Sequence, residues 1–379
     1  MIVIYFIAHS EWILHRSRAD MVKLLKSNFQ IVSVSPLNEY VDEIKEDYFE
    51  SINWGIDRTK LLDIKGIVNL KNIIKNFNEN DIIHIFTIKS LYLFIFATMF
   101  FKKKFKVIVS ITGLGFLFAD TLLAKMLRNI SKPIIRLKIN TSVDILIFQN
   151  KNNLDQFVKY SNYKNNSIMI SGSGLNINKF VTKKEPSDVT KIIFVGRLMR
   201  EKGINEFLEI AEEFVDDDRV LFFIAGKPDF GNKSSLNAIQ FEQLQKNPSV
   251  NYLGEIDVQK ELSKYDLLLQ PSYHEGFSRI LIESIYSGVF CIANNIFGMK
   301  EIIEKTKYGV LIDGNNINDY KNEIIKFIDS QELPNYEFAK KTIIENYSLE
   351  AIAKQFEELY DELIKWFSSI YIHSFCYCI

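Results

Sequence analysis

The chain has 379 residues, of which 47% are hydrophobic and 25% are charged, and its formal net charge is −1. This composition excludes a disordered, collagen-like or disulfide-scaffold protein. The length exceeds what one hydrophobic core usually serves, so it predicts two domains. The three cysteines, Cys291, Cys376 and Cys378, have no zinc-type spacing and are too few for a disulfide framework, so we expect a reducing compartment.

The two halves of the chain differ in charge. Residues 1–180 contain 24 Lys and Arg against 15 Asp and Glu, whereas residues 181–379 contain 22 against 32. A basic half can face nucleic acid, an anionic membrane or a phosphorylated substrate, or the difference can have no function. Nucleic acid is disfavoured, because aromatic residues are not interleaved with the basic clusters as a single-strand platform requires.

Short apolar runs alternate with helical patterns along the whole chain. The first run has no basic region or small-residue cleavage site, which predicts a buried strand rather than a signal peptide. Runs rich in Val, Ile and Phe predict strands covered on both faces, and therefore parallel sheets. The first series of predicted strands is 2–7, 31–35, 82–86, 106–110, 145–149 and 168–171. The second series is 191–195, 220–225, 250–253, 267–270 and 289–293.

These two series predict an α/β protein with two doubly wound domains. A polar segment with a helix-incompatible proline, residues 183–188, is the expected linker. We therefore expect an N-terminal domain over 1–182, a C-terminal domain over 189–346 and a helix with an apolar tail over 347–379.

No apolar run reaches the roughly 20 residues that span a bilayer. The longest, residues 91–101, precedes three lysines. Its length favours a buried helix over the alternative, a helix lying in the membrane surface with lysines at the headgroups. The apolar tail, residues 366–379, either packs on the N-terminal domain or contacts lipid.

The segment after predicted strand 191–195 combines glycines and cations. Gly196 and Arg197 open it, and Lys202 and Gly203 close it before a predicted helix. Glycine lets the backbone approach a ligand, and a helix N-terminus already favours anions. The segment predicts a diphosphate site, with a solvated basic loop as the alternative.

Two glutamates follow predicted strand 267–270. Glu275 lies in the loop and Glu283 on the helix expected after it, with Gly276 between them. Carboxylates can accept hydrogen bonds from sugar or ribose hydroxyls. The alternative is an ordinary acidic helix start, which the helix dipole favours.

Together these residues resemble the family 4 retaining glycosyltransferases of the GT-B fold. The resemblance covers nearly the whole chain, and the spacing of the two glutamates is specific in this setting. It implies two Rossmann-like domains facing a cleft, with a C-terminal helix that returns to the N-terminal domain. Matching positions of the C-terminal half are 194–198, 201–203, 254, 257–258, 266, 271–272, 275–277, 283, 288, 298, 301 and 309.

The N-terminal half is similar to a bacterial subgroup that builds capsule, O-antigen and other lipid-linked glycans. The matching segments are 12–16, 87–89, 111–115 and 172–174. The similarity implies transfer of HexNAc, often GalNAc in α-1,3 linkage, from UDP-HexNAc to a sugar on undecaprenyl diphosphate. It further implies front-face attack with retention, and neither a metal nor another cofactor.

The resemblance also assigns roles to residues of the C-terminal half. Arg197 and Lys202 bind the diphosphate and stabilise its leaving charge, and Glu275 acts with them at the donor sugar. Glu283 holds the ribose hydroxyls. The other donor-binding residues are Gly196, Gly276 and Phe277.

On the N-terminal side the implied cleft residues are His15, His84, Lys89, Thr112, Gly113, Gly172 and Gly174. His84 is expected to end a strand and face the cleft. The family often has a second histidine two residues later, where this chain has Phe86, and the usual glycine pair of the first loop is replaced by residues 8–11. Both departures weaken the assignment of the acceptor side.

Other candidate ligands lack partners at suitable spacing. His9, His274 and His373 are expected to be surface or structural residues. Residues 216–218 contain an Asp-x-Asp pattern but precede a strand, so we expect a solvated turn and predict no metal site.

These expectations make a nucleotide sugar, a polyprenyl-diphosphate-linked acceptor and the anionic inner membrane surface the partners, without nucleic acid. The protein is then cytoplasmic and peripherally bound to the inner face of the bacterial plasma membrane. The alternatives are a soluble acceptor, another donor such as a deoxy-HexNAc or GDP-sugar, and a non-catalytic subunit that binds nucleotide sugars.

Overall fold

The computed structural model describes residues 2–57, 60, 63–101, 103–118, 121–182, 189–232, 234–330 and 333–375. Its contacts divide the chain into two compact units. Unit 1 comprises Met1–Gly174 and Leu349–Ile379, and unit 2 comprises Leu175–Ser348. The predicted domain ends were 182 and 346, and the predicted linker, residues 183–188, lies outside the described residues.

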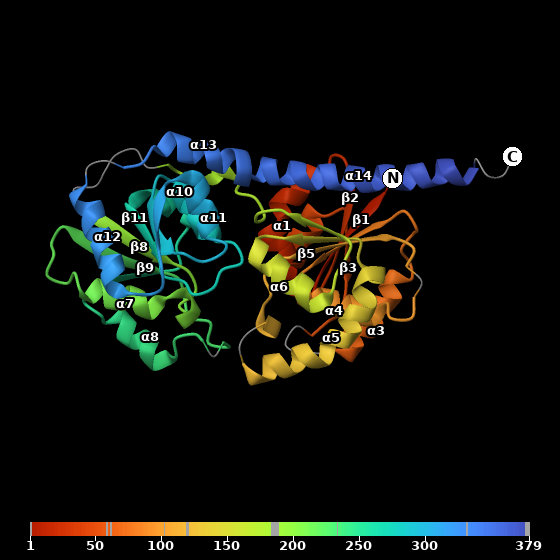
Figure 1. Cartoon of the computed structure of the whole chain (residues 1–379), viewed down its shortest axis with the longest axis horizontal. Helices are drawn as coiled ribbons and strands as arrows, with labels where there is room; N and C mark the ends of the chain where they lie inside the picture. The colour runs from red at the N-terminus through yellow and green to blue at the C-terminus, as the bar shows by residue number, and fades with distance from the viewer. Residues whose placement is uncertain are drawn as a thin grey trace. The chain divides into compact units, whose positions relative to one another are not determined.

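Unit 1 is built on a seven-stranded parallel sheet (Figure 1). Its strands are β1 (Val3–Ala8), β2 (Gln30–Ser35), β3 (Glu50–Asn53), β4 (Ile82–Phe86), β5 (Lys106–Ile111), β6 (Ile145–Phe148) and β7 (Asn166–Met169). The spatial order is β3-β2-β1-β4-β5-β6-β7, so the winding reverses between β1 and β4. Six strands confirm the prediction; β3 was missed because it is short, polar and partly exposed.

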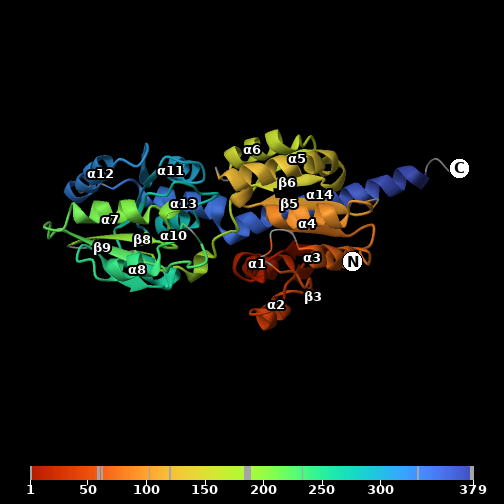
Figure 2. The same ribbon diagram turned by 90° about the horizontal axis from the view of Figure 1, so that it is seen from below.

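Helices cover both faces of this sheet (Figures 1 and 2). On one face lie α1 (Glu11–Leu25), α2 (Val41–Asp47) and α14 (Leu349–Phe375). On the other lie α3 (Ile64–Ile74), α4 (Ile88–Ala97), α5 (Leu122–Ser142) and α6 (Lys151–Ser161), with a 3-10 turn η1 (Phe116–Phe118). Burial of both faces explains why the strand sequences are apolar throughout rather than alternating.

The apolar run 91–101 forms a buried helix, as predicted. It supplies most of α4, and Leu91, Phe94 and Ile95 are buried in the core of unit 1. The helix ends at Ala97, however, and Phe100 beyond it is exposed. Among the described residues, no helix has the length and apolar composition needed to cross a bilayer.

The last helix, α14, returns to unit 1, as the resemblance implied. Ile352, Phe356 and Tyr360 pack in a core shared with β1, β4 and α1. The side chains of the tail, 366–379, lie outside the described residues, so the choice between packing and lipid contact stays a prediction.

Unit 2 contains a six-stranded parallel sheet. Its strands are β8 (Thr190–Val195), β9 (Val220–Ala225), β10 (Asn251–Gly254), β11 (Leu267–Gln270), β12 (Phe290–Asn294) and β13 (Gly309–Ile312). The order is β10-β9-β8-β11-β12-β13, the Rossmann order, which reverses between β8 and β11. Five strands confirm the prediction, whereas β13, a partly exposed edge strand that begins at a glycine, was missed.

Helices and short turns connect the strands of unit 2. The helices are α7 (Ile204–Glu212), α8 (Ala238–Gln245), α9 (Val258–Glu261), α10 (Arg279–Tyr286), α11 (Lys300–Thr306), α12 (Ile317–Asp329) and α13 (Tyr336–Tyr347). The 3-10 turns are η2 (Ile177–Lys179), η3 (Arg200–Lys202) and η4 (Leu262–Lys264).

Candidate active site

Two loops of unit 2 meet where the winding of its sheet reverses. Strands β8 and β11 are hydrogen-bonded neighbours and run parallel, so the segments that follow them emerge at the same edge. These segments are 196–203 and 271–278. Ligands of open α/β sheets bind at this position, beyond the carboxyl ends of the strands. The structure therefore brings together the two segments that the sequence singled out.

Lys202 and Glu275 form an ion pair between these loops. Lys202 Nζ lies 2.5 Å from Glu275 Oε1, and the two side chains are only 22% and 11% exposed. Ser272 Oγ donates a further hydrogen bond to Glu275 Oε1, at 3.4 Å. Because the pair is mostly withdrawn from water, its attraction is screened less than that of a surface pair. The ammonium group is thus held in a fixed place.

Glycine is required where these loops touch. Gly203 has φ +78°, and a Cβ there would lie 2.2 Å from the carbonyl oxygen of Pro271. Gly298, after β12, has φ +85° and would place a Cβ 2.7 Å from the oxygen of Gly276. Ser278 N–H donates to the Gly298 oxygen at 3.0 Å. Three loops are thus packed backbone to backbone around Glu275, which only glycine permits.

Arg197 has a different partner. Its side chain is 58% exposed, and Nη1 lies 3.2 Å from Oδ2 of Asp229, in the loop after β9. The neighbouring Gly196 N–H donates to the Ala225 oxygen at 3.0 Å, which fixes the start of the loop. Asp229 was not among the predicted site residues, although its position shortly after a strand adjacent to β8 was a usable signal.

Glu283 lies on α10, one turn after its partner Arg279. Arg279 Nε donates to Glu283 Oε1 at 2.7 Å, and Glu283 is buried. Burial raises the pKa of Glu283, while the nearby charge of Arg279 opposes the rise. Phe277 packs against Tyr347, with ring centroids 5.6 Å apart. Arg279 was missed in the sequence, although its spacing of four residues from Glu283 on a helix indicates a pair.

His84 is not at the edge of the unit 1 sheet, and the expectation that it faces a cleft was wrong. It lies in the middle of β4 and is completely buried. Its Nε2 is 2.7 Å from Ser110 Oγ, and its Nδ1 is 2.7 Å from the Tyr360 hydroxyl. Burial holds the pKa of His84 well below its usual value. The strand continues for two residues beyond it, so His84 is a structural residue.

The other N-terminal candidates lie on several elements. His15, on α1, stacks on Tyr40 with ring centroids 4.6 Å apart. Lys89, in the first turn of α4, donates to the Lys60 oxygen at 2.8 Å, and burial lowers the pKa of Lys89.

Three candidate positions of unit 1 follow strands. Thr112 and Gly172 line one small cavity, together with Arg18 and Phe356. At Gly113 a Cβ would meet no atom within 4 Å, so this position faces open space. Gly174 differs from these, because with φ +84° a Cβ there would lie 2.7 Å from Leu349 Cα, which indicates a packing role.

His9 and Thr87 mark the point where the unit 1 sheet reverses its winding. They directly follow the neighbouring strands β1 and β4, and Thr87 Oγ1 lies 2.9 Å from His9 Nδ1. Thr87 has φ 78°, which is costly for a β-branched residue and is characteristic of functional sites. His9 was predicted to be a surface or structural residue, although its position directly after the first strand was an available signal for a site.

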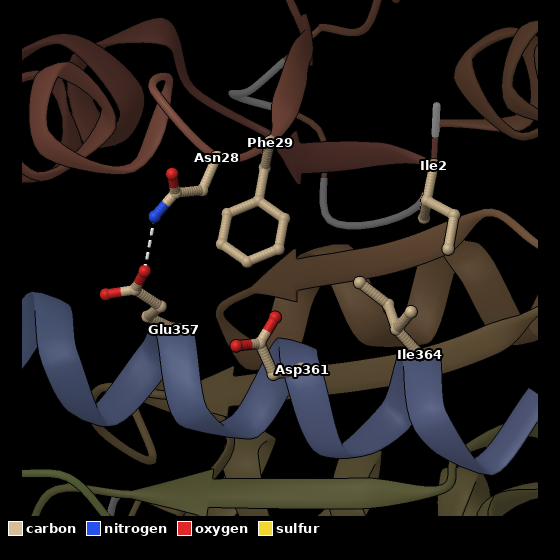
Figure 3. A pocket seen from close by; sticks show the side chains of 6 residues that line it. All are labelled: Ile2, Asn28, Phe29, Glu357, Asp361 and Ile364. Atoms are coloured by element: carbon tan, nitrogen blue, oxygen red, sulfur yellow. Dashed lines mark hydrogen bonds between the residues drawn. The ribbon is translucent and has the colours of Figure 1, made fainter.

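A hollow of about 220 Å³ in unit 1 lies at the opposite edge of the sheet (Figure 3). It is lined by Ile2, Asn28, Phe29, Glu357, Asp361 and Ile364. Asn28 donates to the carboxylate of Glu357 across it. Because Ile2 precedes β1, the hollow opens at the amino ends of the strands, away from the edge at which such sheets bind ligands.

Acidic residues do not gather into a metal-type cluster in the part of the chain that the structure describes. Residues 216–218 form the expected turn before β9. Asp217 accepts from Arg219 Nη2 at 2.7 Å, and this hydrogen bond lowers the pKa of Asp217 to about 2.

Comparison with known proteins agrees with this geometry. A curated relative, the N,N'-diacetylbacillosaminyl-diphospho-undecaprenol alpha-1,3-N-acetylgalactosaminyltransferase of Campylobacter jejuni, is 25% identical over 95% of this chain and 98% of its own. The poly(ribitol-phosphate) alpha-N-acetylglucosaminyltransferase of Staphylococcus aureus is 30% identical over 44% of this chain and 34% of its own.

Solved structures show the fold. HepE of Anabaena, in complex with UDP and glucose, superposes with a TM-score of 0.74 at 15% identity, over 95% of this chain and 99% of that one. A glycosyltransferase from Rickettsia africae gives 0.74 at 18% identity, over 96% and 99%. Two family models match, "Glycosyl transferase 4-like" over residues 3–150 and "Glycosyl transferases group 1" over residues 177–344. The chain therefore belongs to the glycosyltransferases of the GT-B fold, with a 4-like domain followed by a group 1 domain.

Proposed function

We propose that this protein transfers a hexose-type sugar, with HexNAc from UDP-HexNAc as the first candidate, to a sugar carried on undecaprenyl diphosphate, with retention of configuration. The observation that carries the proposal is the partly buried Lys202–Glu275 pair at the reversal point of a group 1 domain. A fixed cation at this edge suits a leaving diphosphate.

The proposed step breaks the bond between the anomeric carbon of the donor and the diphosphate oxygen. A bond from the acceptor hydroxyl oxygen to the same carbon forms on the same face. The hydroxyl proton passes to the departing diphosphate oxygen. Lys202, joined by Arg197 after it leaves Asp229, stabilises the negative charge of UDP. The proposed step requires no metal ion.

The two glutamates hold the donor at either end. Glu275, with the amides of Gly276 and Phe277, contacts the donor sugar. Its ion pair with Lys202 fixes the position of the sugar contact relative to the diphosphate contact. Glu283 accepts hydrogen bonds from the ribose hydroxyls, and these are strongest when its carboxyl group is ionised. Its partner Arg279 favours that ionised state.

Two observations support the lipid-linked acceptor. The Campylobacter jejuni relative, which matches over nearly the whole chain, is named for a diphospho-undecaprenol-linked acceptor. The basic character of residues 1–180 suits a diphosphate acceptor and an anionic cytoplasmic leaflet. The protein then works at the inner face of the bacterial plasma membrane, in O-antigen, capsule or related polysaccharide synthesis.

A donor panel against two acceptors tests the proposal. UDP-GalNAc, UDP-GlcNAc, UDP-glucose and GDP-mannose are each offered with a short-chain polyprenyl diphosphate sugar or with the free sugar. We expect nucleotide release only with a UDP-HexNAc and the polyprenyl acceptor, and an α-type anomeric coupling in the product by NMR. Release with the free sugar alone, or an inverted product, contradicts the proposal.

A further inference from the structure

Helix α5 turns an apolar row toward solvent. Ala124, Ile135 and Ile139 are its buried residues, and the last two belong to the core of unit 1. The exposed apolar side chains of the same helix are Leu122 (85%), Leu123 (53%), Met126 (52%), Ile130 (63%) and Leu137 (75%). The helix is therefore apolar on the side that packs and on a side that meets solvent.

The exposed residues form one row and are not scattered. At about 100° per residue, the five positions fall within a sector of roughly 100°, on the side of the helix away from its buried residues. From Leu122 to Leu137 the row extends for about 22 Å along the axis. Single exposed apolar residues are normal on soluble proteins, but a continuous row marks an interaction surface.

The charges of α5 have one sign. The helix carries Lys125, Arg128, Lys132, Arg136 and Lys138 and contains no Asp or Glu. Lys125, Lys132 and Arg136 follow one another at helical spacing along one flank of the row. Arg128 and Arg136 donate to main-chain carbonyls, of Leu117 and Tyr160, which leaves their charge in place. An apolar row beside cations is the pattern of helices that lie in a membrane surface.

The location of α5 suits this reading. It lies at the margin of unit 1, on the face of the sheet opposite α14 (Figure 1). Its first turn follows the loop that leaves β5 at Thr112 and Gly113, at the carboxyl edge of the sheet. The start of the row is thus near the edge at which unit 1 would receive an acceptor. Most of the run 91–101, the earlier membrane candidate, is packed in α4 against the core of unit 1 and is unavailable for contact.

We propose that the outward face of α5 lies in the surface of an anionic bilayer, with Leu122, Met126 and Ile130 at the acyl boundary and the flanking cations at lipid phosphates. This inference rests on the proposed function, because a lipid-linked acceptor gives the protein a reason to bind a membrane. The surface itself is argued from exposure and charge alone.

Vesicle flotation with the full-length protein tests the inference. Vesicles of phosphatidylcholine with 30% phosphatidylglycerol are compared with pure phosphatidylcholine, at low and high salt. We expect binding to the anionic vesicles at low salt only. The L122Q/I130Q variant should reduce the partition coefficient about 10-fold or more, because each side chain loses apolar burial. K125Q/K132Q should reduce it about 10-fold at low salt and little at high salt.

The matched control is Ile239→Gln, which removes an equally exposed apolar side chain (70%) from α8 of unit 2 and should leave flotation unchanged. Absence of wild-type binding, or equal binding by L122Q/I130Q, overturns the inference. So does a dimer in solution that L122Q/I130Q dissolves, since a second copy would then cover the face. Nucleotide release by the wild type with a short-chain acceptor, in vesicle-free solution, reports the proposed function separately.

Discussion

His84, at the centre of the unit 1 sheet, is hydrogen-bonded through Nδ1 to the hydroxyl of Tyr360 in the last helix, at 2.7 Å. The two residues are 276 positions apart, and both are completely buried. The other core contacts of α14 are mainly apolar and therefore less directional than a hydrogen bond. The polar pair fixes one placement, because any other leaves a buried donor or acceptor unpaired.

Tyr360→Phe should destabilise unit 1 by about 1–3 kcal/mol, because the imidazole Nδ1 loses its partner in a buried place. All three tryptophans, Trp12, Trp54 and Trp366, belong to unit 1, so tryptophan fluorescence in urea reports its unfolding. Tyr40→Phe, at a partly exposed tyrosine, is the control and should change stability by less than about 0.5 kcal/mol. Equal urea unfolding midpoints for the two variants would show that the His84–Tyr360 hydrogen bond does not stabilise the position of α14.

Acid should weaken unit 1 through His84. Burial lowers the pKa of His84 in the folded state, so between that pKa and about 6.5 the unfolded chain binds the extra proton. Stability is therefore fully present above about pH 6.5 and falls as the pH decreases, by up to about 1.4 kcal/mol per pH unit. His84→Asn should flatten this dependence in urea titrations from pH 5 to 8. An imidazole proton resonance of His84 that titrates near 6.5 would refute the prediction.

Lys202→Ala should reduce kcat about 10²–10³-fold, as loss of a donor to a developing charge does, and change the donor KM much less. Steady-state UDP release measures both constants. The control is Lys246→Ala, which removes a lysine just after α8 whose side chain pairs with Glu242 at the surface. Near-normal turnover of Lys202→Ala, or an effect confined to KM, would remove its role at the leaving group.

The pH dependence of donor binding should report Glu283. Burial raises its pKa and Arg279 opposes the rise, so removing Arg279 raises the pKa further. Because the proposed ribose contact is stronger with the ionised carboxylate, UDP affinity should fall as the pH decreases through this pKa. Arg279→Ala should move the midpoint to higher pH, and Arg279→Lys should restore it, in calorimetric titrations from pH 5 to 8. Coincident midpoints in all three proteins would contradict the assignment.

The stability costs of Gly203→Ala and Gly314→Ala should distinguish the effect of backbone strain from that of a steric clash with the added Cβ. The two glycines have nearly the same φ, +78° and +77°, but a Cβ at Gly314 meets no atom within 4 Å. Gly314→Ala should cost about 1–2 kcal/mol. Gly203→Ala should cost about 2 kcal/mol more and abolish transfer, because the Pro271 loop must move away. Calorimetric unfolding and UDP release measure the two effects, and equal costs would argue against the collision.

Both parallel sheets, and the proximity of loops 196–203 and 271–278, could be predicted from the sequence. Parallel strands buried on both faces are continuous apolar runs, and residues that follow neighbouring strands share an edge. Strands β3 and β13 were missed because edge strands are short and partly exposed. The position of His84 was misjudged because its partner Tyr360 is remote in the chain. The pairing of Lys202 with Glu275 and of Arg197 with Asp229 was not predicted, because packing between loops brings these residues together.

The chain enters and leaves unit 2 at one place. Leu175 N–H donates to the Tyr347 oxygen at 2.8 Å, and Gly174 is packed against Leu349 in unit 1. During synthesis, the ribosome therefore releases all of unit 2 before it releases α14. Until α14 emerges, the sheet face of unit 1 that receives Phe356 and Tyr360 stays uncovered. Stalling translation on an unstructured linker fused after Ser348, long enough to span the ribosome exit tunnel, should leave a nascent chain in which unit 2 resists protease and unit 1 recruits chaperones.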